Sequence, residues 1–267
     1  HEFNHASQLA YTCRDGSTDT WFLENTAVWV AEIAYNYAYN YYQRYFEGPD
    51  PLDYPEFGIH TSWPDLGNYN YAGFLWPKFL AEWKNDNTVI RKIWQRFNQN
   101  PGDNILPDIN YVLSQPEYGS SLNEAARYYA EWRYFTGERD DENHFVNAFD
   151  LPTSAIFVTN EVTQINGFGG TKFIQLNPSE EMIEINFNGD NNVVWSANII
   201  EYKYIPPSLN TSITLNNFYD GSIEAITEDC NYIVLTPILL SDITKKSFTY
   251  SANMIDARKI YFYNKKG

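Results

Sequence analysis

The sequence contains little cysteine. Only two of its 267 residues are cysteine, Cys13 and Cys230, so at most one disulfide can form within the chain. This number excludes a scaffold built on disulfides and a zinc site with four cysteine ligands. We expect the two thiols to be unconnected.

Positive charge is scarce as well. Lysine and arginine number 18 against 34 aspartate and glutamate residues, which gives a formal net charge of -16. Such a surface repels nucleic-acid phosphates and anionic membranes, so we expect neither as a partner. No apolar run approaches the roughly 20 residues that span a bilayer, so no transmembrane segment is expected. With 43% hydrophobic and 18% aromatic residues, the chain can nevertheless bury a sizeable core.

The two halves of the chain differ in pattern. Residues 1–150 hold 10 basic and 22 acidic side chains and all four histidines, whereas residues 151–267 hold 8 basic and 12 acidic ones. The first half predicts helices in three segments: 21–45, with Ser17, Thr18 or Asp19 as N-cap; 71–97; and 121–137, with Ser120 or Ser121 as N-cap. Residues 51–70 are expected to form an irregular loop that carries His60.

In the second half, short runs rich in β-forming residues alternate with turn residues. They predict strands at 155–158, 172–176, 182–187, 193–204, 212–215, 222–226, 232–237, 247–251 and 259–263. The chain is therefore expected to be α+β, with a mainly helical domain at 1–150 followed by an all-β sandwich at 151–267, either immunoglobulin-like or a jelly roll.

The sequence opens with His1-Glu2-Phe3-Asn4-His5, an H-E-x-x-H pattern. On a helix, His1 and His5 lie one turn apart on the same face, so both imidazoles can bind one metal ion. Neutral imidazole suits Zn²⁺, and Glu2 lies where a carboxylate can take the proton of a water activated by zinc. The pattern therefore predicts zinc-dependent attack of water on a carbonyl carbon.

A catalytic zinc ion commonly has three protein ligands. Glu24 follows His5 with 18 residues between them, which leaves room for a turn and a second helix packed against the first. Ala27, one turn after Glu24, is small enough for close helix packing. We therefore predict His1, His5 and Glu24 as the ligands.

H-E-x-x-H, 18 residues and then E-x-x-A within a W-x-x-E-x-x-A run resemble the gluzincin zinc metallopeptidases. The wider context is similar to secreted bacterial metalloproteases in which a helical zinc domain precedes a β-sandwich. The resemblance implies a secreted or cell-surface zinc peptidase, most simply an endopeptidase, that acts on a peptide or protein. It also implies that a signal peptide and the substrate-binding sheet lie upstream of His1, so that 1–150 is the later part of a larger catalytic domain.

Gluzincins use a tyrosine or histidine to stabilise the oxyanion of the tetrahedral intermediate. Here the resemblance implies Tyr71 for this role, with Tyr69 as the next candidate. Thermolysin-like members place an aspartate four residues after the third ligand to orient a histidine. This sequence has Val28 there, so another carboxylate or a backbone carbonyl must take this role, and Glu32 is one candidate.

Two alternatives stay open. The chain could be a non-catalytic extracellular binding or structural module derived from a metalloprotease, with its aromatic residues forming a recognition surface. It could also bind copper through the amine and imidazole of His1, with His60 or His144 as a second ligand. In the β half, Asp190, Asp220, Glu228 and Asp229 lie near predicted turns, where they could bind Ca²⁺ or simply be solvated.

Overall fold

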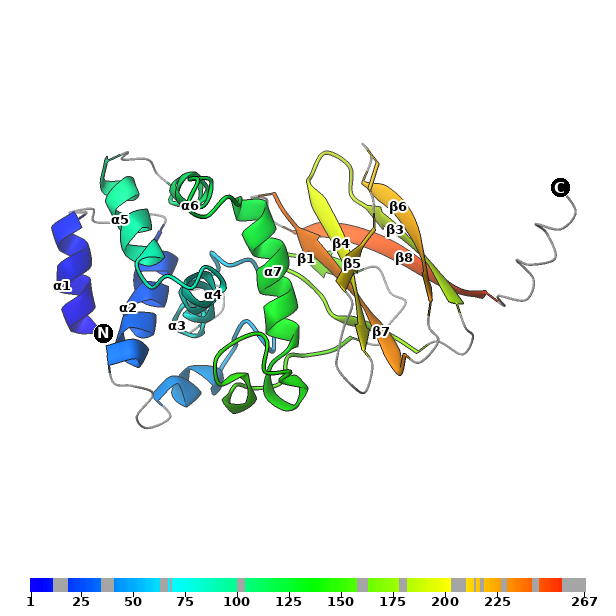
Figure 1. Cartoon of the computed structure of the whole chain (residues 1–267), viewed down its shortest axis with the longest axis horizontal. Helices are drawn as coiled ribbons and strands as arrows, with labels where there is room; N and C mark the ends of the chain where they lie inside the picture. The colour runs from blue at the N-terminus through cyan, green and yellow to red at the C-terminus, as the bar shows by residue number, and fades with distance from the viewer. Residues whose placement is uncertain are drawn as a thin grey trace, which may run out of the picture. The chain divides into compact units, whose positions relative to one another are not determined.

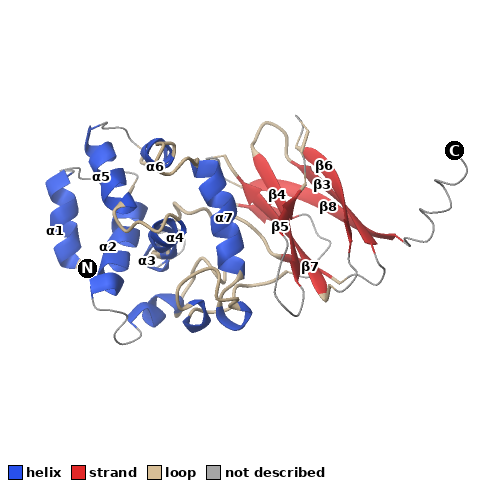
Figure 2. Cartoon of the chain, in the orientation of Figure 1, coloured by secondary structure: helices blue, strands red, loops and turns tan. Residues whose placement is uncertain are grey.

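The protein folds into two compact units. A computed structural model describes residues 1–11, 19–34, 41–62, 67, 69–99, 104–157, 163–177, 182–202, 210–213, 215–216, 219–226, 230–241 and 245–255. The helical unit comprises His1–Ser154 and the β unit comprises Ala155–Gly267. Figures 1 and 2 show that helices occupy the first unit and strands the second. The predicted α+β class, with a helical region followed by a β-sheet region, is confirmed.

The described part of the helical unit is built from α-helices and short 3-10 helices. In chain order they are α1 (Glu2–Tyr11), α2 (Thr20–Ala34), η1 (Tyr41–Phe46), α3 (Tyr69–Ala72), α4 (Leu75–Trp83), α5 (Val89–Gln99), α6 (Leu106–Leu113), α7 (Leu122–Tyr134), η2 (Gly137–Arg139) and η3 (Ala148–Asp150). Their core is rich in aromatic residues, including the buried side chains of Trp21, Phe22, Trp76, Phe79 and Tyr129.

Two helices show how the local sequence determines the structure. In α5, Ile90, Ile93, Trp94 and Phe97 recur at helical spacing and are buried, which fixes the face that packs on the core. In α7, the Ser121 side chain accepts a hydrogen bond from the Glu124 N–H, as a helix N-cap does. The predicted helix at 121–137 is therefore present, with its predicted cap.

The long helix predicted at 21–45 is shorter than expected. The helix α2 ends at Ala34, residues 35–40 lie outside the described residues, and Tyr41–Phe46 form a 3-10 helix instead of a further α-helix. The predicted helix therefore does not continue as an α-helix to residue 45. The segment predicted at 71–97 contains helices as expected, whereas α6 was not predicted.

The described strands of the β unit form two antiparallel sheets. They are β1 (Thr163–Ile165), β2 (Ile174–Leu176), β3 (Met182–Gly189), β4 (Trp195–Tyr202), β5 (Asn210–Ser212), β6 (Asp220–Ile226), β7 (Tyr232–Leu239) and β8 (Lys246–Ile255). The sheet orders are β1-β8-β3-β6 and β2-β7-β4-β5. This interleaved order is that of an eight-stranded jelly roll.

The inner faces of the two sheets enclose one apolar core. In β3, Ile183, Ile185 and Phe187 are buried, while the alternate residues are more exposed, as the two-residue period of a strand requires. Residues of both sheets meet in this core, among them Ile185, Phe187, Trp195, Leu235 and Phe248. The β unit is therefore a sandwich with an apolar interior.

Most predicted strands overlap observed ones. At 155–158 the observed feature is an isolated bridge from Phe157 to Ile174, and β1 was not predicted because three residues give too short a pattern. The predicted strand at 259–263 lies outside the described residues, as does Cys13. Among the described helices, none combines the length and apolar character needed to cross a membrane.

Candidate metal centre

The two histidines lie at the start of α1. The carbonyl oxygen of His1 accepts hydrogen bonds from the N–H groups of Asn4 (2.8 Å) and His5 (3.3 Å), so the first turn is helical from His1 onward. Both imidazoles therefore project from one face. Their Nε2 atoms lie 3.0 Å apart.

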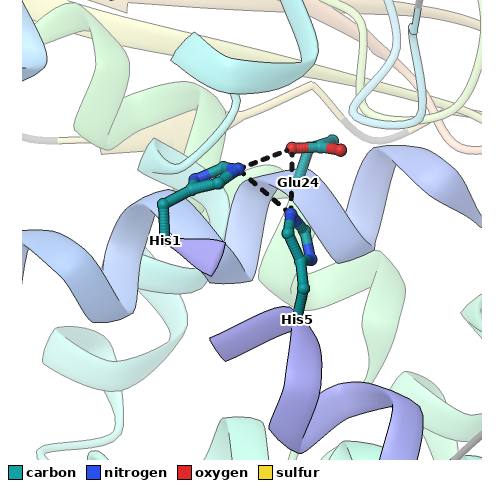
Figure 3. Close-up of side chains that lie close together, drawn as sticks. All are labelled: His1, His5 and Glu24. Atoms are coloured by element: carbon teal, nitrogen blue, oxygen red, sulfur yellow. Dashed lines mark hydrogen bonds and ion pairs between the residues drawn. The ribbon is translucent and has the colours of Figure 1, made fainter. Parts of the chain in front are cut away.

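Glu24 reaches the same point from α2. Its Oε2 lies 3.2 Å from His1 Nε2 and 3.5 Å from His5 Nε2. Figure 3 shows the three side chains converging from two helices. Among the described residues, His1, His5 and Glu24 form the group of histidine, cysteine and acidic side chains whose ligand atoms come close enough together to hold a metal ion.

These distances fit a zinc ion. Ligands at about 2.0–2.1 Å from zinc in tetrahedral geometry lie about 3.3 Å from one another, and the three observed separations are 3.0, 3.2 and 3.5 Å. The side chains are 17–21% exposed, so water can reach the group.

The electrostatics of the group also favour a cation. Burial raises the pKa of the Glu24 carboxyl above its usual range; His5 opposes this shift and Glu2 adds to it. The buried Glu24 Oε2 contacts the two imidazoles, and His1 Nδ1 is a buried atom with no hydrogen-bond partner among the described residues. A divalent cation would compensate the carboxylate, and two imidazoles with one carboxylate form one of the ligand sets that catalytic zinc sites use.

Tyr71 lies beside this group. Its ring centroid is 5.9 Å from that of His1, and its other neighbour is the stacked ring of Tyr45, at 5.6 Å. Burial raises the pKa of the Tyr71 hydroxyl, and the carboxylates of Glu24 and Glu2 raise it further. The hydroxyl therefore keeps its proton and remains a hydrogen-bond donor at neutral pH.

A close contact between α2 and the end of α3 places Tyr71 there. The Asn25 side chain, next to Glu24, is buried and donates a hydrogen bond to the Asn70 carbonyl oxygen. A Cβ atom on Gly73 would lie 2.5–3.0 Å from the Asn25 side chain, so only glycine permits this approach. The contact fixes the distance between the helix that carries Glu24 and the helix that carries Tyr71.

Tyr69 faces another part of the unit. Its hydroxyl donates to the carbonyl oxygens of Phe57 (3.2 Å) and Tyr54 (3.4 Å), and burial raises its pKa well above the usual range. It anchors the loop at 51–62 to α3. Tyr71 and Tyr69 were both predicted as candidates, and only Tyr71 lies next to the three ligand candidates.

Glu2, the predicted general base, lies at the rim of the group. Its side chain is 91% exposed, and its carboxylate is 4.0 Å from His1 Nε2. The carboxylate is therefore near the ligand candidates and free to turn toward a water between them and the solvent.

Other residues named from the sequence lie in different surroundings. Glu32 is buried on α2, where burial raises its pKa and Lys78 lowers it. His144 pairs with Asp141 and Glu131, and neither it nor His60 joins His1 in a metal-ligating group among the described residues. In the β unit, the Asp190 carboxylate accepts a hydrogen bond from the Ser247 N–H, whereas Glu228 and Asp229 lie outside the described residues.

One partner of the site was missed in the sequence. His5 Nδ1 lies 2.7 Å from Oε1 of Gln8, three residues later on α1. The sequence prediction named another carboxylate, such as Glu32, or a backbone carbonyl for this role. A polar side chain at i+3 from a ligand histidine was the available signal, since these two positions are neighbours on a helix.

Comparisons with known proteins leave the family open. No family model matches the chain, and no curated protein matches it. A search of solved structures finds the pre-peptidase C-terminal domain of a collagenase from Bacillus anthracis, at 14% identity and a TM-score of 0.29, covering 39% of this chain and 98% of that one. It also finds a family GH115 4-O-methyl-α-glucuronidase with specificity for decorated arabinogalactans, at 7% identity and a TM-score of 0.22, covering 71% of this chain and 30% of that one. Both TM-scores are too low to carry an inference about fold or function.

Proposed function

We propose that the helical unit holds one zinc ion and hydrolyses peptide bonds. The observation that carries the proposal is the convergence of His1 Nε2, His5 Nε2 and Glu24 Oε2 at separations of 3.0, 3.2 and 3.5 Å. The peptide as substrate class, and a secreted or cell-surface setting, rest on the likeness of the sequence pattern to gluzincins.

Each residue has a distinct part in this proposal. His1, His5 and Glu24 hold the ion, which, when bound, polarises a carbonyl group and makes water more acidic. Glu2 takes the proton of the attacking water and passes it to the leaving amine, and its carboxylate lies 4.0 Å from His1 Nε2. Tyr71 keeps its proton and donates a hydrogen bond to the oxyanion as it develops.

The metal content tests the first part. We expect about one zinc per chain by elemental analysis after zinc loading and dialysis. Glu24→Ala removes a direct ligand and should weaken zinc affinity by more than ~100-fold, beyond the cost of losing a partner of a ligand. Glu138→Gln, an exposed acidic residue of the same unit, is the matched control and should bind zinc like the wild type. A wild-type protein that binds no zinc contradicts the proposal.

Cleavage of a fluorogenic protein substrate by the zinc-loaded protein tests the second part. Glu2→Gln should retain zinc and lose ~10²–10⁴-fold in rate. Tyr71→Phe should retain zinc and lose ~10²–10³-fold. Tyr69→Phe is its matched control, because the Tyr69 hydroxyl binds only backbone carbonyl oxygens in the described structure and should affect stability more than rate.

The exposure of Glu2 favours a second candidate. A side chain that is 91% exposed is not held in a catalytic position, which suits a non-catalytic binding module that retains the ligand group. This alternative predicts stoichiometric zinc but no cleavage by the wild type and no difference between it and Glu2→Gln.

A further inference from the structure

Gln8 connects the two helices that carry the ligand candidates. Its side chain is buried, with 3% of the residue exposed. Its Oε1 lies 2.7 Å from His5 Nδ1, and its Nε2 donates to the Leu23 carbonyl oxygen (3.0 Å) and to Thr26 Oγ1 (2.7 Å). Leu23 and Thr26 flank Glu24 on α2, so one amide joins His5 to the turn that presents Glu24.

The partners of this amide fix its orientation. The Leu23 carbonyl oxygen can only accept hydrogen bonds, and the Thr26 hydroxyl already donates to the Phe22 carbonyl oxygen at 2.7 Å. The amide group that faces both must therefore be the NH₂ group. Its oxygen must then face His5, and an amide oxygen only accepts.

The orientation of the amide determines the tautomer of His5. Since Gln8 Oε1 accepts from Nδ1, the proton of the neutral imidazole lies on Nδ1. Nε2 then presents its lone pair toward His1 Nε2 and Glu24 Oε2, at 3.0 and 3.5 Å. His1 differs, because its Nδ1 is buried with no hydrogen-bond partner among the described residues.

We propose that Gln8 is the positioning residue of the metal centre. It holds His5 in the tautomer whose Nε2 is a metal ligand, and it fixes the spacing between His5 and Glu24 through Leu23 and Thr26. This inference rests on the proposed zinc site. Gln8 acts on the site through His5 and does not bind the ion itself.

Two measurements on the full chain test this role. Zinc affinity is measured by competition with a chromophoric chelator, and the tautomers of His5 and His1 in zinc-free protein by ¹⁵N NMR of the imidazoles above their titration range. In the wild type, His5 should be in the Nδ1–H form. In Gln8→Leu, which has no acceptor, His5 should become a mixture of both tautomers, and zinc affinity should fall ~10–100-fold.

Three variants separate this role from a loss of folding. Gln8→Glu keeps an acceptor for His5 Nδ1 and should keep the tautomer, with zinc affinity between that of the wild type and Gln8→Leu. Thr26→Val removes one acceptor of the amide while keeping the side-chain shape, and should weaken zinc binding less than Gln8→Leu. Gln95→Leu, on the exposed face of α5, is the matched control and should leave both readouts unchanged.

The outcomes distinguish this inference from the proposed function. Wild-type protein that binds no zinc overturns the proposed function. Wild-type protein that binds zinc, with Gln8→Leu unchanged in affinity or in the tautomer of His5, overturns only the role of Gln8.

Discussion

The two units bury different kinds of side chain. Among the described residues, the helical unit buries polar and charged groups throughout its interior, including Asn25, Glu32, Asp50, Lys78, Asp108 and Arg133. The core of the β unit is apolar, and its buried polar residues include Thr171, Asn198, Glu201 and Thr236. The ligand candidates all lie in the helical unit.

This difference separates the unit that holds the ligand candidates from the unit with an apolar core. A buried polar group costs free energy unless hydrogen bonds compensate it, so proteins retain such groups where they have a use. The helical unit contains several buried atoms with no hydrogen-bond partner among the described residues, such as Asn25 Oδ1, Asp50 Oδ2 and Asn70 Oδ1. In the described part of the β unit, such atoms are Asp220 Oδ1 and Thr236 Oγ1.

The largest expected effect on stability lies in the apolar core of the β unit. Phe248 is fully buried and packs on Phe187 and Trp195, with ring centroids 5.5 and 5.8 Å away. Phe248→Ala should lower the free energy of unfolding by about 3–5 kcal/mol, because it removes apolar contact and leaves a cavity. Zinc affinity should not change, since no ligand candidate lies in this unit. Denaturant unfolding and chelator competition measure the two quantities.

A matched control comes from the same strand. Met254 lies on β8 and is 38% exposed, so Met254→Ala should cost less than about 0.5 kcal/mol. If Phe248→Ala lowers zinc affinity in protein that is still folded, the two units are energetically coupled and the division of roles is wrong.

The second-largest expected effect on stability lies in the interior of the helical unit. Asp50 is fully buried and accepts hydrogen bonds from the N–H groups of Leu52 and Asp53. Burial raises the pKa of Asp50 to about 6, against the opposing effect of these hydrogen bonds. Because the folded state holds this proton more tightly, the stability that Asp50 contributes is fully present below about pH 4 and lost as the pH rises through 6.

Asp50→Asn keeps the amide oxygen that accepts both hydrogen bonds and removes the ionisation. The variant should be more stable than the wild type by about 3 kcal/mol at pH 7, with the difference vanishing toward pH 4. Urea unfolding of zinc-free protein across this range measures the difference. Asp150→Asn, at an exposed position, should show no such pH dependence. A constant difference for Asp50→Asn at all pH values would contradict the assigned pKa.

The sequence predicted those parts of the molecule that local patterns determine. The polar and apolar alternation of β3 and the cap at Ser121 were both readable. His1, His5 and Glu24, which the spacing suggests as metal ligands, lie close together: helix geometry places the first two on one face, and α2 brings Glu24 to them. That they bind a metal ion stays a prediction.

The remaining features depend on packing between segments. The choice between Tyr71 and Tyr69 is made by the contact of Asn25 with Gly73, 48 residues apart in sequence, which no local pattern contains. The orientation of Gln8 depends on acceptors on α2, and the sheet orders depend on pairings between distant strands. Such features depend on tertiary contacts, which the periodicity of the sequence does not reveal.

The smallest expected effect concerns His144. Its ring stacks on Phe135 at 4.3 Å, and its Nδ1 lies 2.7 Å from Asp141. Burial lowers the pKa of His144, but Glu131 and Asp141 together raise it above its usual value.

The protonated ring therefore contributes stability that is present below pH ~6.5 and lost as the pH rises through the higher pKa of the folded state. The cost of His144→Gln should be larger at pH 6 than at pH 9, because the stabilising charge is lost as the pH rises. Glu131→Gln removes one of the two carboxylates and should lower the pKa of His144 in an NMR titration. If the pKa of wild-type His144 is found at or below 6.5, this account is wrong. The contrast between the two units would then rest on Asp50 and the metal centre alone.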